Sequence, residues 1–422
     1  MRSMTVNQRA RVWSAGLLLV AGGILMLGRL DAVQPSRPAI SAAGKAALSQ
    51  YLTATVDRGD VPGVVALAVD RDSVLYEGAA GKQDVARNVA MRVDTLFRIA
   101  SMTKPVTSVA AMMLVEAGAL GLDDPVSKYL PAYEHREVLT SFNATSGAYE
   151  SRPAKRPITI RHLMSHTSGL GYGWSSPIVS RLTENNRDRE TEIPLLFDPG
   201  DKWAYGASTR VLGQVVEKVS GQPLDTFFLE RIVGPLKLTD TSYVVPPEHT
   251  SRVVTVHRRA DGRLTEQPNA PVQQAAVSGE GGLYSTARDY GTFLRMLLNG
   301  GSLGNATLLS PKSVAMMGDN HIGAVIVEEQ PAADAARTRP FPLGAGRDTF
   351  GLGFQIAARD ERYARLRSPG SLSWAGINNT HFWIDPDRHL AVVVLMQVLP
   401  FYDERCIEVL RGVEELVYRH LG

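Results

Sequence analysis

Apolar residues recur with strand or helix spacing at both ends of the chain. Near the start, an amphipathic helix is predicted at Ala42–Val56, and two strands at Gly63–Val69 and Ser73–Gly78 are joined by a short turn. Strand patterns return in the last third and end in a helix; the predicted segments are Gly353–Ile356, Leu372–Ala375, Thr380–Ile384, Leu390–Val398 and the helix Asp403–His420. Both ends therefore carry strands and a flanking helix.

Helical periodicity dominates the middle of the chain. The predicted helices are the segment after Ser101, Ile160–Ser165, Thr209–Val219, Asp225–Ile232, Thr286–Leu298 and Pro311–Met317. This order favours an α/β (α+β) fold in which both ends build one antiparallel sheet, residues 39–96 and 345–422, with a helical lobe, 97–344, inserted between them. A functional site is expected in the cleft between the two lobes.

Composition excludes several classes of function. The 422 residues include 45 basic and 43 acidic side chains, with no basic cluster interleaved with aromatics, so nucleic acid is not an expected partner. Cys406 is the sole cysteine, which excludes an internal disulfide and a thiolate metal cluster. His162 and His166 lie four residues apart without a nearby acidic or cysteine partner, and H-E-x-x-H is absent. We therefore expect neither a metal nor another cofactor.

The N-terminus indicates export. Three arginines precede the apolar run Val12–Leu27, whose length as a helix, roughly 24 Å, is short of a bilayer core of ~30 Å. Residues 1–38 are predicted to be a signal peptide, or an uncleaved anchor, followed by a linker. Either interpretation places the rest of the chain in the periplasm or outside the cell, with membrane contact only through that anchor.

The most informative local motif is Ser101-Met102-Thr103-Lys104. On a helix, positions three apart share a face with their Cβ atoms about 5–6 Å apart. A lysine amine at that distance can activate a serine hydroxyl as a nucleophile, particularly where burial lowers the amine pKa. Alone, the motif is weak, because Ser-x-x-Lys pairs arise by chance in chains of this length.

Further segments give the motif a context. Together, in this order, they resemble the serine β-lactamase and penicillin-binding-protein superfamily: Phe97–Lys104, Gly121–Val126, Ile158–Leu170, Pro199–Gly200 with Tyr205, Gly281–Thr286 with Asp289, and Trp374–Gly376. The resemblance covers nearly the whole chain after residue 40. It implies the β-lactamase-like fold for residues 39–422, and it implies that Ser101 is the nucleophile.

Two departures from the penicillin-recognising pattern change the expected substrate. Trp374 stands where the family has the lysine of Lys-Thr-Gly, and Ala207 stands where class C β-lactamases have the asparagine of Tyr-x-Asn. Tyr with Trp-x-Gly is similar to the family VIII carboxylesterases. A flat apolar side chain in place of a cation suits an uncharged ester of small to medium size.

The resemblance also implies roles for the other site residues. Tyr205, assisted by Lys104, would take the proton of Ser101, and the backbone N–H groups of Ser101 and Ile377 would hold the oxyanion. Gly376 would let the substrate approach the strand closely.

Several alternatives stay open. The same fold could hydrolyse an amide, as a β-lactamase or D-amino-acid peptidase does, could transfer its acyl group to another acceptor, or could be an inactive binding protein. Ser302 lies in a G-x-S-x-G match, but a helical run precedes it where a nucleophile elbow needs a strand. His166 is a possible base, although a structural role in its loop is favoured. The sequence carries no prediction of oligomeric state.

Overall fold

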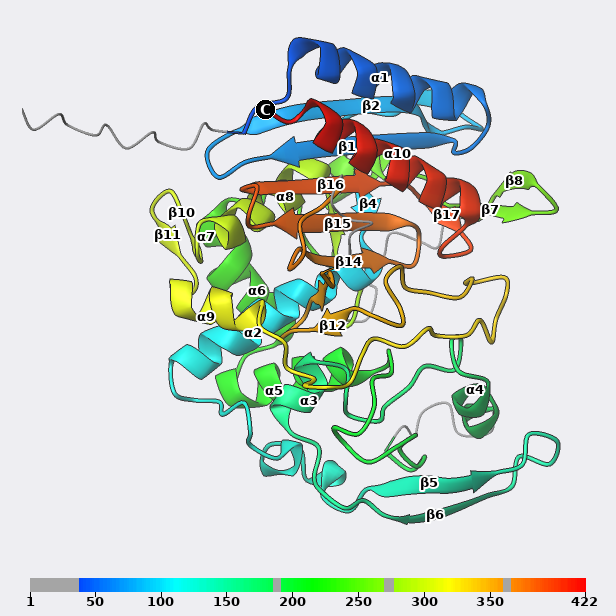
Figure 1. Ribbon diagram of the computed structural model, residues 1–422, viewed down its shortest axis with the longest axis vertical. Helices are drawn as coiled ribbons and strands as arrows, with labels where there is room; N and C mark the ends of the chain where they lie inside the picture. Colours follow the sequence, from blue (N-terminus) through cyan, green and yellow to red (C-terminus); the bar gives the residue numbers. More distant parts are fainter. Residues whose placement is uncertain (1–37, 185–190, 269–276, 360–365) are drawn as a thin grey trace, which may run out of the picture. The chain divides into compact units, whose positions relative to one another are not determined.

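The computed structural model describes residues 38–184, 191–268, 277–359 and 366–422 (Figure 1). The predicted signal peptide or anchor lies, up to Arg37, outside the described residues. Within the described ranges, no helix is both long and apolar enough to cross a bilayer.

Helices and strands are interspersed along the chain. The helices are α1 Ala42–Asp57, α2 Thr103–Glu116, α3 Ile160–Met164, α4 Pro177–Thr183, α5 Ser208–Ser220, α6 Leu224–Phe228, α7 Gly234–Leu236, α8 Ala287–Leu298, α9 Pro311–Met317 and α10 Glu404–His420. The strands are β1 Gly63–Val69, β2 Val74–Asp84, β3 Val89–Ala90, β4 Phe97–Arg98, β5 Glu137–Phe142, β6 Tyr149–Pro153, β7 His257–Ala260, β8 Arg263–Glu266, β9 Tyr284–Ser285, β10 Ser302–Leu303, β11 Ala306–Thr307, β12 Thr349–Phe350, β13 Gln355–Ile356, β14 Leu372–Gly376, β15 Thr380–Asp385, β16 Leu390–Leu395 and β17 Val398–Leu399.

The main sheet is built from both ends of the chain, as the sequence predicts. Its strand order is β12-β13-β14-β15-β16-β1-β2-β3, and all of its strand pairs are antiparallel. Strand β1, from the N-terminal part, pairs with β16 from the C-terminal part, with Leu67 opposite Val393. The sheet therefore joins segments more than 300 residues apart in sequence.

Helices cover both faces of this sheet, which explains why its central strands are continuously apolar. On β1, Val65 and Leu67 belong to the core on the side of α2 and α8, whereas Val64 and Ala66 belong to the core beneath α1 and α10. This alternation follows from the two-residue repeat of a strand. Figure 1 shows α1 and α10 side by side over the sheet, drawn in blue and red.

Three predictions about elements need correction. Residues 390–398 form two strands, because the backbone leaves the sheet after β16 and β17 pairs with β7 instead. The predicted helix at 225–232 ends as α6 and continues as a π-helical turn, Leu229–Val233. Strands β5 and β6 form a hairpin within the segment predicted to be helical and loop-like, and their side chains are mostly exposed, which removes the apolar alternation that would reveal them.

The turn between β14 and β15 depends on Asn379. This residue is fully buried and has a φ of 58°, a left-handed conformation that asparagine tolerates better than most residues. Its Nδ2 donates to the carbonyl oxygens of Val398 and Pro400, each at 2.8 Å, and its Oδ1 accepts from Tyr402 N at 3.0 Å. One side chain thus ties this turn, which ends the site strand, to the segment leading into α10.

We predict that Asn379→Ala lowers the free energy of unfolding by about 3 kcal/mol or more, because it leaves several buried backbone groups unpaired. Urea unfolding would measure the change. Asn88→Ala is the matched control, since Asn88 has a similar φ of 57° but is exposed; it should cost about 1 kcal/mol. Equal losses in the two variants would contradict the role assigned to the Asn379 hydrogen bonds.

Candidate active site

Ser101 lies at the entrance to α2, at the point where the chain leaves the short strand β4. Ala100, just before it, has a φ of 47°, and Ser101 is half-buried in the 3₁₀ turn Ala100–Met102. Non-glycine residues in this region of φ are held by their surroundings and concentrate at functional sites. Here Ile99 N donates to Leu283 O at 3.0 Å, and Tyr290 Oη donates to Met102 O at 2.9 Å. The serine hydroxyl therefore stands on a fixed turn.

Lys104 contacts Ser101 directly. Its Nζ donates to Ser101 Oγ at 3.1 Å and to the carbonyl oxygen of Glu280 at 2.8 Å. The same Nζ lies 4.8 Å from the ring centroid of Tyr205 and 5.5 Å from that of Tyr172. Because Lys104 is only 2% exposed, these groups replace the water that an ammonium ion would otherwise bind.

Glu280 connects this lysine to a second charged group. Its carboxylate accepts hydrogen bonds from Tyr172 Oη and from Arg210, whose Nε is 2.8 Å from Glu280 Oε1. Burial, followed by the charge of Glu280, raises the pKa of Tyr172 well above its usual value, so Tyr172 remains a neutral donor. Tyr205, by contrast, hydrogen bonds to no carboxylate among the described residues.

Tyr205 is positioned by contacts at both ends. Its backbone N–H donates to Gln330 Oε1 at 3.1 Å, and its hydroxyl oxygen accepts from Trp374 Nε1 at 3.4 Å. The rings of Tyr205 and Trp374 have their centroids 4.9 Å apart. The tryptophan that replaces the lysine of the Lys-Thr-Gly motif thus contacts the tyrosine expected to act as a base.

The end of β14 approaches the serine turn closely. A Cβ on Gly376 would collide with Ile99 O and with Thr380 Oγ1, at a separation that no real side chain tolerates. Glycine is therefore required at this position because a side chain would not fit, and not because the backbone has a positive φ. Ile377 follows on the same strand end, so its N–H is next to the serine turn, where the resemblance expects an oxyanion donor.

Comparison with known proteins agrees with this geometry. The family model described as Beta-lactamase matches residues 48–413. Monacolin J acid methylbutanoyltransferase of Aspergillus terreus (strain NIH 2624 / FGSC A1156) is 30% identical over 384 residues, which cover 85% of this chain and 92% of that protein.

The chain belongs to the β-lactamase family.

Two solved structures show the same fold. Unliganded simvastatin synthase (LovD) from Aspergillus terreus, as its selenomethionyl derivative, has a TM-score of 0.77 and 27% identity, covering 90% of this chain and 98% of that one. EstCE1, described as a hydrolase with promiscuous acyltransferase activity, has a TM-score of 0.71 and 26% identity, covering 88% of this chain and 99% of that one. The β-lactamase-like fold predicted from the motifs is confirmed.

The sequence motifs identify several residues of this site, but they do not identify the residues that contact and position them. Ser101, Lys104, Tyr205 and Trp374 come together as predicted, whereas Tyr172, Glu280 and Gln330 were not singled out. Glu280 immediately precedes the Gly281–Thr286 motif, so its position was the available signal. No pattern marks Tyr172 or Gln330, because their contacts depend on the tertiary fold.

His166 forms part of the wall of this β-lactamase-family site. Its ring lies 4.9 Å from that of Tyr205 and 5.4 Å from that of Phe350, and its side chain makes no hydrogen bond to a described residue. Burial, with the nearby charge of Lys104, holds the His166 pKa well below its usual range. His166 therefore contacts its surroundings through ring packing, and no side-chain hydrogen bond to a described residue fixes it.

The remaining candidates lie elsewhere. Ser302 is in the β10–β11 hairpin after α8, where its Oγ pairs with Thr307 Oγ1 at 3.0 Å. His162 uses its Nδ1 to accept a hydrogen bond from Thr159 N, and no three metal-ligating side chains cluster in the part of the chain that the structure describes.

The contact between His162 and Thr159 generates a pH prediction. Thr159 caps α3 by accepting from His162 N, and His162 Nδ1 accepts from Thr159 N at 3.1 Å, so the cap needs a neutral imidazole. Burial and the charge of Arg156 lower the pKa of His162 to about 4. The unfolded chain, with a histidine pKa of about 6.5, therefore binds more protons between these values.

The stability due to His162 is complete above pH 6.5 and is lost as the pH falls toward 4. Because the ring is partly exposed, we expect about 1 kcal/mol of this loss between pH 7 and pH 5. His162→Gln keeps the cap acceptor without the titration and should reduce the acid-dependent decrease in the free energy of unfolding. The exposed His135→Gln is the control. An unchanged decrease in His162→Gln, measured by urea unfolding at several pH values, would exclude this assignment.

Proposed function

We propose that this protein is a serine hydrolase that cleaves small to medium carboxylic esters through an acyl-enzyme on Ser101. The observation that carries the proposal is the hydrogen bond from Lys104 Nζ to Ser101 Oγ, within a site walled by Tyr205 and Trp374. A nucleophile, its activating partner and an apolar wall are the parts that ester cleavage needs.

In the first half-reaction, Ser101 Oγ attacks the ester carbonyl carbon and forms a C–O bond. The serine proton passes to the Lys104–Tyr205 pair, and from there to the oxygen of the leaving alcohol as the ester C–O bond breaks. Lys104 Nζ lies 4.8 Å from the ring centroid of Tyr205 and 3.1 Å from Ser101 Oγ, so both side chains lie beside the hydroxyl whose proton must move. In the second half-reaction, water attacks the acyl carbon and the pair takes its proton. That proton returns to Ser101 Oγ as the acyl C–Oγ bond breaks and the carboxylic acid is released.

Negative charge on the carbonyl oxygen requires donors that are already in place. We assign this role to the backbone N–H groups of Ser101 and Ile377; the close approach of Gly376 to Ile99 supports this assignment. A donor of this kind typically contributes about 3 kcal/mol to stabilising the transition state.

Features of the wall favour esters over penicillins. Trp374 is 7% exposed and packs its ring against those of Tyr205 and Phe350, so its position offers no cation to a substrate carboxylate. Ala207, fully buried at the start of α5, offers no amide to the side chain of a β-lactam. An anionic substrate would lose water around its charge without gaining an ion pair.

We predict turnover of p-nitrophenyl acetate to hexanoate esters and at least a hundredfold lower kcat/KM for a chromogenic cephalosporin. Ser101→Ala should lower kcat by about a thousandfold or more, since it removes the nucleophile. Tyr205→Phe should lower it by about a hundredfold or more, as expected for loss of a general base. Steady-state kinetics would measure both.

Ser302→Ala is the control for the nucleophile, because Ser302 lies in the competing G-x-S-x-G sequence. It should leave kcat unchanged. Full activity in Ser101→Ala, or loss of activity in Ser302→Ala, would overturn the mechanism, and efficient cephalosporin hydrolysis would overturn the substrate class.

Acyl transfer is a second candidate, favoured by the methylbutanoyltransferase relative and by the promiscuous transfer described for EstCE1. In that case an alcohol, in place of water, attacks the same acyl-enzyme. With p-nitrophenyl butyrate and added alcohols, chromatography would measure how the acyl group divides between free acid and new ester. A fraction of new ester well above that of the uncatalysed reaction supports transfer; free acid alone excludes it for the alcohols used.

A further inference from the structure

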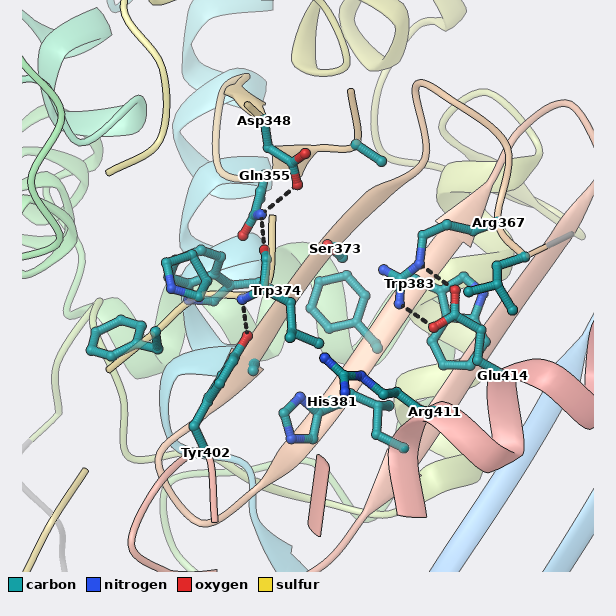
Figure 2. Close-up of a pocket in the computed structure, with 18 of the residues that line it drawn as sticks. Asp348, Gln355, Arg367, Ser373, Trp374, His381, Trp383, Tyr402, Arg411 and Glu414 are labelled. Carbon is teal, nitrogen blue, oxygen red and sulfur yellow. Dashed lines mark hydrogen bonds and ion pairs between the residues drawn. The ribbon is translucent and has the colours of Figure 1, made fainter. Parts of the chain in front are cut away.

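A second cavity, of about 520 Å³, lies behind the strand that carries Trp374 (Figure 2). On β14 and β15, Ser373 pairs with Trp383 and Ala375 with His381, so these four residues share one face of the sheet. Trp383 belongs to the core beneath α10, so this is the face opposite the catalytic serine. None of Ser101, Lys104 and Tyr205 lines the cavity.

A buried histidine without a partner lines this cavity. His381 is 4% exposed, and its buried Nε2 makes no hydrogen bond to a residue that the structure describes. Its ring lies 6.3 Å from that of Phe401. Burial, followed by the charge of Arg367, lowers the His381 pKa to about 3, so the imidazole is neutral and keeps one N–H donor. Unpaired buried polar groups are rare in native proteins, and bound molecules commonly satisfy them.

Most charges around the cavity are already neutralised. Arg367 forms a two-point ion pair with Glu414, at 2.7 and 2.9 Å, and Arg347 pairs with Asp348, with Nε and Oδ1 3.7 Å apart. Glu415 pairs with Arg419 on the same helix. These side chains therefore leave little net charge for a ligand.

Arg411 is the exception. It is exposed on α10, and within the described ranges it has no hydrogen bond or ion pair. Figure 2 shows its side chain extending over His381. The walls between these two polar groups and β14 are largely apolar, lined by residues that include Phe341, Leu343, Phe401 and Leu410.

We propose that this cavity binds an amphipathic monocarboxylate, such as a medium-chain fatty acid. The carboxylate pairs with the Arg411 guanidinium and accepts the imidazole N–H of His381, and the hydrocarbon chain lies among the aromatic walls. One unpaired cation matches one negative charge, whereas a phosphate dianion would need more. The apolar walls match a chain that loses its contact with water.

Trp374 links this cavity to the catalytic site. The same residue lines the cavity and donates its indole N–H to Tyr205 Oη. If the proposed function is taken as the basis, the ligand belongs to the same chemical class as the acid that ester hydrolysis releases. The binding itself does not depend on that function.

Calorimetric titration of the protein with octanoate and with octanol tests the proposal. Octanoate should bind with one-to-one stoichiometry, and octanol, which lacks the carboxylate, should bind at least tenfold more weakly. Arg411→Gln should weaken octanoate binding at least tenfold. Lys45→Gln, the same charge change at an exposed position on α1, should leave it unchanged.

Two further variants locate the ligand. Ser373→Leu, which fills the cavity from β14, should abolish octanoate binding, whereas a phosphonate bound covalently to Ser101 should leave it intact. Octanoate binding that survives in Arg411→Gln, or that the phosphonate blocks, would overturn the proposal. Failure of ester turnover would overturn the proposed function alone, because titrations of the Arg411, Lys45 and Ser373 variants measure binding without catalysis.

Discussion

The buried ammonium of Lys104 is the constraint on which the rest of this site depends. Removing a cation from water costs several kcal/mol unless protein groups replace the lost hydration. In this site the replacement comes from Ser101 Oγ, the carbonyl oxygen of Glu280 and the ring of Tyr205. These residues come from segments far apart in sequence, so the helical lobe must close around α2 before the lysine can be buried. The arrangement that stabilises the cation also aligns the candidate nucleophile and base.

Trp374 makes one wall of this site apolar and uncharged. In penicillin-recognising relatives a lysine at this position supplies a cation, whereas in this chain an indole supplies an apolar wall and one N–H donor to Tyr205. The change removes an anchor for anionic substrates and positions the tyrosine hydroxyl. Since Trp374 also lines the cavity beneath α10, one residue contacts both the site and that cavity.

The sequence predicts elements well where burial imposes a strong period. Strand β1 matches the predicted Gly63–Val69, and α10 begins one residue after the predicted start because Asp403 caps it, accepting from Cys406 N at 3.2 Å. The β5–β6 hairpin is not predicted from the sequence, because its exposed side chains do not alternate between apolar and polar residues. The Ser101–Lys104 contact was predictable because it lies within one helical turn.

The supporting contacts were beyond sequence reasoning. Glu280 meets Tyr172 across 108 residues and Arg210 across 70, and Gln330 meets Tyr205 across 125. Contacts across such long sequence separations leave no periodic pattern in the sequence, because the packing of the whole lobe brings these side chains together. The position of His381 in the lining of the cavity beneath α10 likewise depends on the register of β14 and β15 and on the placement of α10.

Trapping the covalent intermediate tests the central claim most directly. After rapid mixing with p-nitrophenyl acetate and an acid quench, intact mass spectrometry would count the acetyl groups on each protein molecule. Peptide mapping would then locate them. We expect a burst of p-nitrophenol matched by one acetyl group on the peptide that contains Ser101. Turnover without an acetyl group on that peptide, or with the label on another residue, would contradict it.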